Sequence, residues 1–140
     1  MKKTAEQLVA EANAEIETLS VDEARIVHDA CDAVLVDIRD IRELNREGRV
    51  PGAVHAPRGM FEFWVDPQSR YHKEVFAQRD KKYVFFCAAG WRSALANKAM
   101  QDMGLKPVAH IDGGFGAWRE AEAPIDAPEP AGENPKAARA

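Results

Sequence analysis

Three short apolar runs, separated by helical patterns, constrain what this chain can fold into. Residues 33–38 and 83–86 are rich in branched and aromatic side chains, and residues 108–111 form a third run of this kind. Runs this short and apolar are typical of strands that are buried on both faces of a parallel sheet. Because these strands alternate with helical stretches, the sequence predicts an α/β fold, with a mainly parallel central sheet and helices on both faces.

The segments between the runs carry helix signals. Thr4 followed by Gln7, and Ser20 followed by Glu23, match the capping-box pattern, and apolar residues follow at helical spacing. The first helix forms an N-terminal extension that we expect to lie against the domain, and the second extends to about His28. Further helices are expected over residues 40–47, 93–103 and 115–122, and a short strand over residues 54–56.

The length of 140 residues suits one compact domain. We expect three parts: a helical extension at residues 1–19, the domain at 20–123, and a flexible tail at 124–140, which is rich in proline and alanine. The aromatic segment at residues 60–64 either forms one wall of the site or fills the core.

Charge and composition exclude several classes of function. No apolar run approaches the ~20 residues of a membrane span, and no apolar signal region follows the basic start. The formal net charge of -4 is mild and basic residues alternate with acidic ones, so we expect no nucleic-acid partner. Cys31 and Cys87 lack redox-pair spacing and the histidines lack ligand spacing, so we expect free thiols, a reducing cytoplasm and no metal.

The segment from Cys87 to Ser93 carries the candidate chemistry, because a cysteine at the end of a buried strand precedes a tight loop that opens a helix. Unpaired N–H groups at a helix N-terminus favour an anion or a thiolate. Gly90 permits a turn that a side chain would obstruct, and the positive charge of Arg92 favours the thiolate further. The pattern predicts a nucleophilic cysteine in an anion cradle. A buried structural cysteine is the alternative.

This Cys-x4-Arg-Ser loop resembles the active-site loop of rhodanese-like sulfurtransferase domains, and three other segments agree with that family in order and spacing. Residues 36–39, with Glu43, resemble its early V-D-x-R...E segment. Residues 49–57 resemble its G-H-I-P-G-A-x-x-x-P segment, with Arg49 in place of the usual histidine. Residues 111–118 resemble its L-x-G-G-x-x-x-W segment. Together the resemblance covers residues 19–123.

The resemblance implies a two-step transfer without metal or organic cofactor. Cys87 takes a sulfane sulfur from a small donor such as thiosulfate, forming a persulfide, and a thiol or cyanide acceptor removes it. In such domains the loop amides cradle the outer sulfur and Arg92 holds the loop or the anionic substrate. The loop residues are Ala88, Ala89, Gly90, Trp91, Arg92 and Ser93.

Supporting roles follow from the same resemblance for Asp37 and Arg39, which we expect to hold the loop and scaffold. Arg58 is a candidate for binding an anion, or a surface arginine without that role. Arg92 has a second interpretation as the ion-pair partner of a carboxylate such as Asp37. Trp91 is a candidate lid over the loop.

Three functions stay open. The first is a sulfurtransferase enzyme. The second is a sulfur-relay or protein-binding module that turns over small donors poorly, which the apolar loop mouth and the extra N-terminal helix motivate. The third is a phosphatase or arsenate reductase, which also uses a cysteine, a cradle and an arginine. The spacing argues against the third, because similar phosphatase loops carry one more residue between the cysteine and the arginine.

Overall fold

The structure is a computed structural model that describes residues 1–128. Its centre is a five-stranded sheet in the order β1-β5-β4-β2-β3, and all neighbouring strands run parallel. The strands are β1 (Thr18–Leu19), β2 (Ala33–Asp37), β3 (Val54–His55), β4 (Lys82–Phe86) and β5 (Val108–Ile111). This arrangement confirms the predicted α/β class and the parallel sheet.

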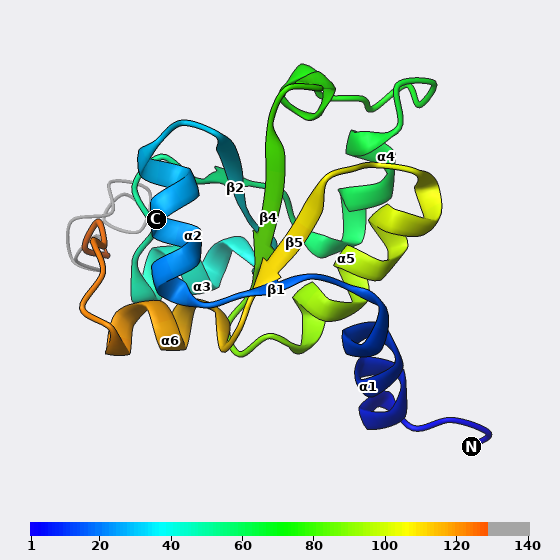
Figure 1. Cartoon of the computed structure of the whole chain (residues 1–140), viewed down its shortest axis with the longest axis horizontal. Helices are drawn as coiled ribbons and strands as arrows, with labels where there is room; N and C mark the ends of the chain where they lie inside the picture. Colours follow the sequence, from blue (N-terminus) through cyan, green and yellow to red (C-terminus); the bar gives the residue numbers. More distant parts are fainter. Residues whose placement is uncertain (129–140) are drawn as a thin grey trace, which may run out of the picture.

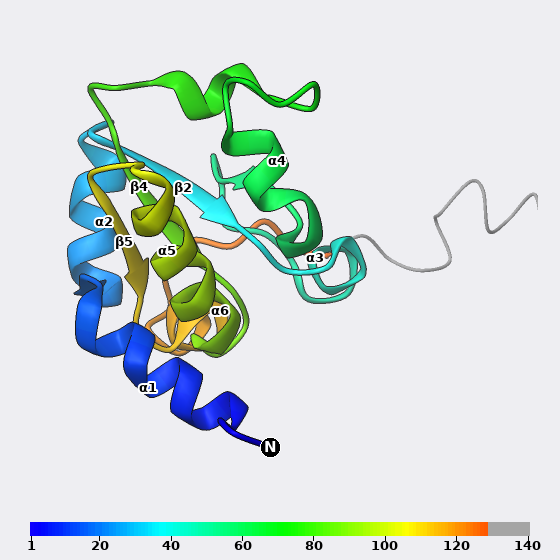
Figure 2. The same cartoon turned by 90° about the vertical axis from the view of Figure 1, so that its right-hand side faces the viewer.

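Helices cover both faces of the sheet, as predicted (Figures 1 and 2). One face packs against α2 (Val21–Asp29) and α6 (Gly114–Glu120), and the other against α4 (Phe61–Val65) and α5 (Trp91–Met103). The remaining elements are α1 (Ala5–Glu15), α3 (Ile41–Glu47) and two short 3-10 helices, η1 (Arg58–Met60) and η2 (Glu74–Ala77).

The core has two halves because successive strand residues point to opposite faces. Leu35 and Val84 pack with α2 and α6, whereas Val36 and Phe85 pack with α4 and α5. Both faces of the central strands are therefore apolar, which explains why the sequence runs show no polar alternation. Cys87 lies in the half that contains α4 and α5.

The N-terminal helix α1 packs against α5 (Figures 1 and 2). Ala12 of α1 is fully buried. Gln101 Nε2 of α5 donates to the Glu15 carbonyl at 3.1 Å, and Lys98 Nζ lies 3.3 Å from a Glu15 carboxylate oxygen. Both predicted capping boxes, at Thr4 and Ser20, are formed.

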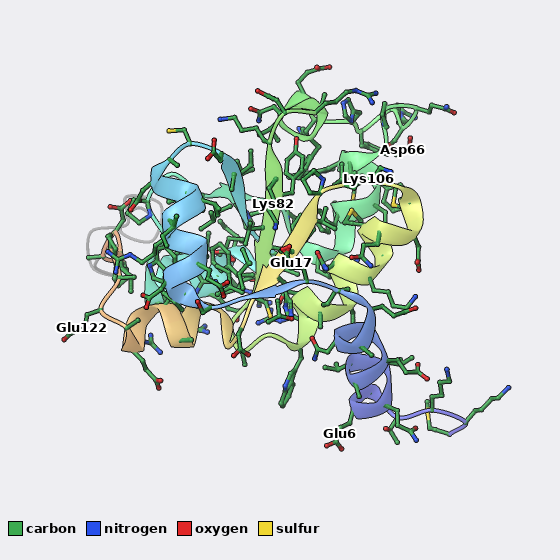
Figure 3. All side chains as sticks on the ribbon, in the orientation of Figure 1. Glu6, Glu17, Asp66, Lys82, Lys106 and Glu122 are labelled. Atoms are coloured by element: carbon green, nitrogen blue, oxygen red, sulfur yellow. The ribbon has the colours of Figure 1, made fainter. Side chains whose placement is uncertain are left out.

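A short strand that the sequence pattern missed, β1, joins this extension to the sheet. It pairs in parallel with β5, so that Thr18 is opposite His110. Glu17, just before β1, forms an ion pair with Lys82 at the start of β4 (Figure 3). Two residues are too few for a periodic pattern, which is why the sequence did not reveal this strand.

The start of the expected tail packs on the domain. Trp118 Nε1 donates to the Pro124 carbonyl at 2.7 Å, and the backbones of Arg49 and Asp126 exchange hydrogen bonds of 3.0 and 2.8 Å. The rest of that expected tail, residues 129–140, lies outside the described residues. Among the helices of residues 1–128, none is long and apolar enough to cross a membrane.

Candidate active site

Cys87 directly follows β4 and its side chain is buried, with a residue exposure of 1%. Its Sγ accepts hydrogen bonds from the backbone N–H of Gly90 at 3.2 Å and of Ser93 at 3.4 Å, and Ser93 Oγ lies 3.6 Å away. Gly90 has a φ of 103°, a left-handed conformation that turns the chain into α5. The loop therefore aims three potential donors at one sulfur atom, at the positive end of a helix.

The beginning of α6 supports this loop from behind. Phe115 N–H donates to the Cys87 carbonyl at 2.7 Å, and Gly116 N–H donates to the Ala88 carbonyl at 3.0 Å. Gly114 has a φ of 56°, and a Cβ placed on it would lie 2.4 Å from the Cys87 carbonyl oxygen. The Gly-Gly segment before α6 thus permits a close backbone approach that no side chain would allow.

Arg92 forms a two-pronged ion pair with Glu43 of α3. Its Nη1 and Nη2 lie 2.8 and 3.0 Å from the two carboxylate oxygens. The hydrogen bond from Arg92 lowers the pKa of Glu43. The pKa of Arg92 is raised, first by Glu43 and to a smaller extent by Cys87. Arg92 therefore pairs with a carboxylate, as its second interpretation expected, and that carboxylate is Glu43, whereas Asp37 pairs with Arg39.

Asp37 and Arg39 form a buried ion pair beneath the loop region. Arg39 Nη2 lies 2.7 Å from Asp37 Oδ2 and donates to the Gly48 carbonyl at 2.9 Å. The Arg39 guanidinium also lies 4.0 Å from the centre of the Phe115 ring in α6. The pair thereby ties β2, the end of α3 and α6 together.

The other candidate residues, Arg58, Trp91 and Cys31, form no hydrogen bond with the sulfur of Cys87 within the described residues. Arg58 begins η1 and its Nη1 pairs with Glu62 Oε1 at 2.8 Å, so its charge is already partly balanced. Trp91 is the first residue of α5 and is 71% exposed. Cys31 is exposed and lies before the start of β2, whereas Cys87 follows the end of the parallel neighbouring strand β4, so the two thiols lie at opposite ends of these strands.

One buried residue that the sequence analysis did not assign to the site, His110, contacts the loop. His110 lies on β5 and is 3% exposed. Its Nδ1 lies 2.9 Å from Ser93 Oγ, and its Nε2 lies 3.2 Å from Thr18 Oγ1. Burial lowers the pKa of His110, and the nearby Asp112 only partly opposes this. The signal that would have revealed it is the register of β1 on β5, which the sequence does not disclose.

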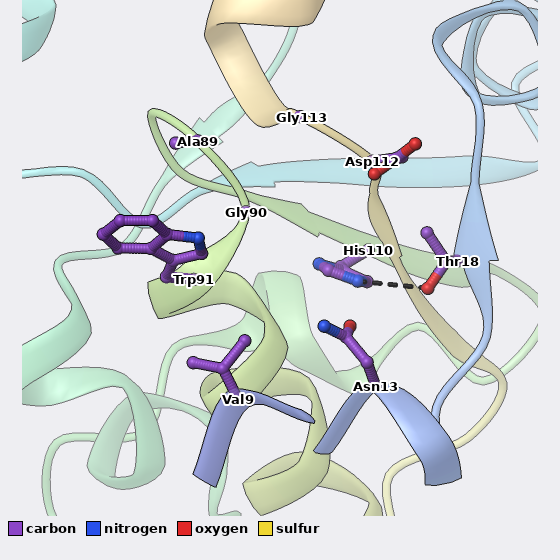
Figure 4. Close-up of a pocket in the computed structure, with 9 residues that line it drawn as sticks. All are labelled: Val9, Asn13, Thr18, Ala89, Gly90, Trp91, His110, Asp112 and Gly113. Carbon is purple, nitrogen blue, oxygen red and sulfur yellow. Dashed lines mark hydrogen bonds between the residues drawn. The ribbon is translucent and has the colours of Figure 1, made fainter. Parts of the chain in front are cut away.

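A cavity of about 360 Å³ lies beside the loop (Figure 4). Its walls come from α1, β1, the loop and the end of β5, so segments distant in the sequence meet there. In Figure 4, Val9 and Asn13 of α1 lie across the cavity from Gly90 and His110. The lining residues are Val9, Asn13, Thr18, Ala89, Gly90, Trp91, His110, Asp112 and Gly113.

The sequence of this chain is similar to those of known proteins. The model of the rhodanese-like domain family matches residues 20–121. The chain is 36% identical over 84 residues to the putative sulfurtransferase YtwF of Bacillus subtilis, covering 60% of this chain and 71% of that protein. It is 31% identical over 105 residues to the thiosulfate sulfurtransferase GlpE of Shewanella oneidensis, covering 75% of this chain and 94% of that protein.

Two solved structures are also similar. A protein of unknown function from Rhodopseudomonas palustris, described as a possible tyrosine phosphatase, is 55% identical with a TM-score of 0.86, covering 90% of this chain and 96% of that one. A thiosulfate sulfurtransferase from Pseudomonas aeruginosa is 22% identical with a TM-score of 0.74, covering 89% of this chain and 23% of that one. At 22% identity, the likeness to the Pseudomonas aeruginosa structure shows a shared fold alone.

Proposed function

Because the chain belongs to the rhodanese-like domain family, we propose that it is a sulfurtransferase whose Cys87 carries a sulfane sulfur as a persulfide. The observation that carries this proposal is the position of Cys87 Sγ, which accepts the N–H groups of Gly90 and Ser93 at the start of α5. These groups stabilise a thiolate before the reaction and the anionic outer sulfur after it.

In the first step, the Cys87 thiolate attacks the outer sulfur of a small sulfane donor such as thiosulfate. A new S–S bond forms to Cys87, the S–S bond within the donor breaks, and sulfite leaves with the electron pair. The product is a persulfide with its negative charge on the outer sulfur. Arg92, fixed by Glu43 near Cys87, favours the approach of an anionic donor.

In the second step, an acceptor thiolate or cyanide attacks the outer sulfur, and the Cys87 thiolate leaves. The products are an acceptor persulfide or thiocyanate, and the enzyme returns to its starting state. The balance of atoms needs no metal or organic cofactor. We place the protein in the cytoplasm, where a reducing environment keeps Cys31 and Cys87 as the free thiols that the structure contains.

The test is intact mass spectrometry before and after incubation with thiosulfate, and again after cyanide. The expected result is a gain of one sulfur atom that cyanide removes, present in the wild type and in Cys31→Ser but absent in Cys87→Ser. Cys31 is the matched control because it is the other free cysteine and is exposed. A gain that persists in Cys87→Ser would refute the proposal. An adduct that forms only from a protein persulfide donor would favour a sulfur-relay module instead.

A phosphatase is the second candidate, favoured by the description of the similar Rhodopseudomonas palustris protein. Against it stands the spacing of the loop, which has four residues between Cys87 and Arg92, one fewer than similar phosphatase loops. Comparing turnover of p-nitrophenyl phosphate with sulfur transfer from thiosulfate to cyanide separates the two. We expect sulfur transfer to exceed phosphate release, and the reverse order would favour the phosphatase.

A further inference from the structure

A buried chain of hydrogen-bonding groups leads away from Cys87 and is not used by the steps above. It passes from Cys87 Sγ to Ser93 Oγ at 3.6 Å, then to His110 Nδ1 at 2.9 Å, and from His110 Nε2 to Thr18 Oγ1 at 3.2 Å. Ser93 and His110 are almost fully buried, whereas Thr18 is exposed and lines the cavity beside α1. The chain therefore connects the buried sulfur with solvent.

Each member of this chain can both donate and accept, so the chain has two complete arrangements. With Cys87 as a thiol, S–H points to Ser93, the Ser93 hydroxyl to Nδ1, and Nε2–H to Thr18. With Cys87 as a thiolate, every bond reverses: Thr18 donates to Nε2, Nδ1–H donates to Ser93, and Ser93 donates to the sulfur. The change moves one proton along each bond, and one proton leaves from Thr18 to water.

The second arrangement depends on His110. A serine hydroxyl rotates freely, and a partner that donates to its oxygen directs its hydrogen elsewhere. We propose that His110 is a positioning residue for Cys87, and that Thr18, by donating to Nε2, stabilises the His110 tautomer that turns the Ser93 hydroxyl toward the thiolate. The inference rests on the proposed function only in taking Cys87 as the nucleophile.

The surroundings suit a neutral imidazole. The titratable groups beside His110 are Cys87, reached through Ser93, and Asp112, which directly follows β5. β1 presents Thr18 and α1 presents Asn13, neither of which titrates. The charged neighbours on these elements are already paired: Glu17 with Lys82, and Lys98 with Glu15 and Asp102.

Thr18 lies outside the segment that the family model matches, which begins at residue 20. Its place opposite His110 comes from the parallel pairing of β1 with β5. The segment before the family domain therefore contributes a residue that acts on the nucleophile of that domain. This gives β1 a role beyond covering the edge of β5.

The test is the rate of Cys87 alkylation by iodoacetamide as a function of pH, which requires no sulfur transfer. His110→Asn keeps a polar group facing Ser93 but loses the contact with Thr18, and Thr18→Val removes the hydroxyl without changing the shape. The control is His72→Asn, because His72 bonds the Trp64 carbonyl instead. Alkylation is measured on Cys31→Ser backgrounds so that one thiol reports.

We expect the midpoint of the profile to rise in His110→Asn and Thr18→Val, so that the rate below the midpoint falls about three- to tenfold. His72→Asn should match the wild type. The alkylation rate of the double variant His110→Asn/Thr18→Val should be no lower than that of His110→Asn, because Thr18 acts only through His110. Unchanged profiles in both single variants, or fully additive effects, would overturn the inference.

The failure of this inference is distinguishable from the failure of the proposed function. Wild-type protein that forms no persulfide, but whose profile still shifts in the variants, refutes the sulfur transfer and supports the role of His110. A normal persulfide with unshifted profiles does the opposite. If His110→Asn does not fold, Thr18→Val still decides, because its side chain is exposed and Val preserves its volume.

Discussion

Among single residues, we expect the buried ion pair of Asp37 and Arg39 to stabilise the fold without taking part in the chemistry of the site. Both side chains are buried, and Arg39 Nη1 has no hydrogen-bond partner among the described residues. The charge of Arg39 is therefore balanced by a single carboxylate, together with the Gly48 carbonyl and the face of Phe115. Removing that carboxylate charge leaves a cation with no way to reach water.

We therefore expect Asp37→Asn to lower the free energy of unfolding by about 3–5 kcal/mol, the usual cost of breaking a buried pair. Urea denaturation followed by circular dichroism measures this. The control is Glu62→Gln, which removes the charged partner of Arg58 in a partly exposed ion pair. It should lower the free energy of unfolding by under about 1 kcal/mol. Equal losses in the two variants would contradict the supporting role of Asp37.

The ion pair between Arg92 and Glu43 predicts a different outcome, because Arg92 lies near the sulfur of Cys87, the proposed nucleophile. Glu43→Gln removes the charge that holds both prongs of the guanidinium, so the rate of persulfide formation from thiosulfate should fall about tenfold. Arg92→Lys should lose a similar factor, because an ammonium group cannot make the two-pronged contact. Stopped-flow or quenched mass measurements give these rates. Wild-type rates in both variants would show that the pair serves stability alone.

At the scale of elements, the site depends on where a strand ends and two helices begin. β4 delivers Cys87, α5 supplies the N–H groups, and α6 binds the carbonyls of the same loop. The closest approach is at Gly114, where the backbone of α6 leaves no space for a side chain.

Gly114→Ala should therefore displace the loop, lower the free energy of unfolding by more than about 2 kcal/mol, and abolish most persulfide formation. Gly104→Ala is a matched control, since Gly104 has a φ of 94° but no atom within 4 Å of an added Cβ. It should cost only the strain of the left-handed conformation, about 1 kcal/mol, with activity retained. Comparable loss of persulfide in both variants would contradict the contact argument.

The elements that sequence patterns predicted are those with local signals. The capping boxes at Thr4 and Ser20, the apolar runs of β2 and β4, and the cysteine loop are all encoded within a few residues. β1, by contrast, is defined only by its pairing with β5. The start of α5 at Trp91 rather than Ser93 reflects the left-handed Gly90, which opens the helix directly after the loop.

The same division applies to the candidate site. The loop and its helix were predictable because the cradle is built from consecutive residues. The partner of Arg92 and the role of Ser93 were not, because Glu43 and His110 reach them from α3 and β5. Side-chain partners that are distant in sequence depend on strand order and register, which local patterns do not carry.

At the scale of the whole molecule, residues before the family domain build part of the site. α1 and β1 form one wall of the cavity beside the loop. α1 packs against α5, the helix at whose start the N–H groups contact Cys87. The hydrogen-bonded chain of Thr18, His110 and Ser93 joins β1, which follows α1, to the loop of Cys87.

The buried imidazole of His110 also makes the stability of the whole fold depend on pH. Burial lowers the pKa of His110 from its ordinary value of 6.5, so the unfolded chain binds a proton more readily than the folded one. Stability is therefore complete above pH 6.5 and falls as the pH drops below that value, until the folded-state pKa is reached. The slope for one proton is at most about 1.4 kcal/mol per pH unit.

We expect urea denaturation of the wild type to give a free energy of unfolding that is level from pH 7.5 to about pH 6.5 and then declines to about pH 5. His110→Asn should flatten this decline even if it lowers the free energy of unfolding at every pH. The measured range stops at pH 5 because Glu43 adds a second pH dependence below it. Arg92 lowers the pKa of Glu43 from its ordinary value of 4.5, so ionised Glu43 stabilises the fold above pH 4.5, and this stabilisation is lost at lower pH. An equal slope in His110→Asn and wild type would show that His110 does not titrate differently in the folded protein.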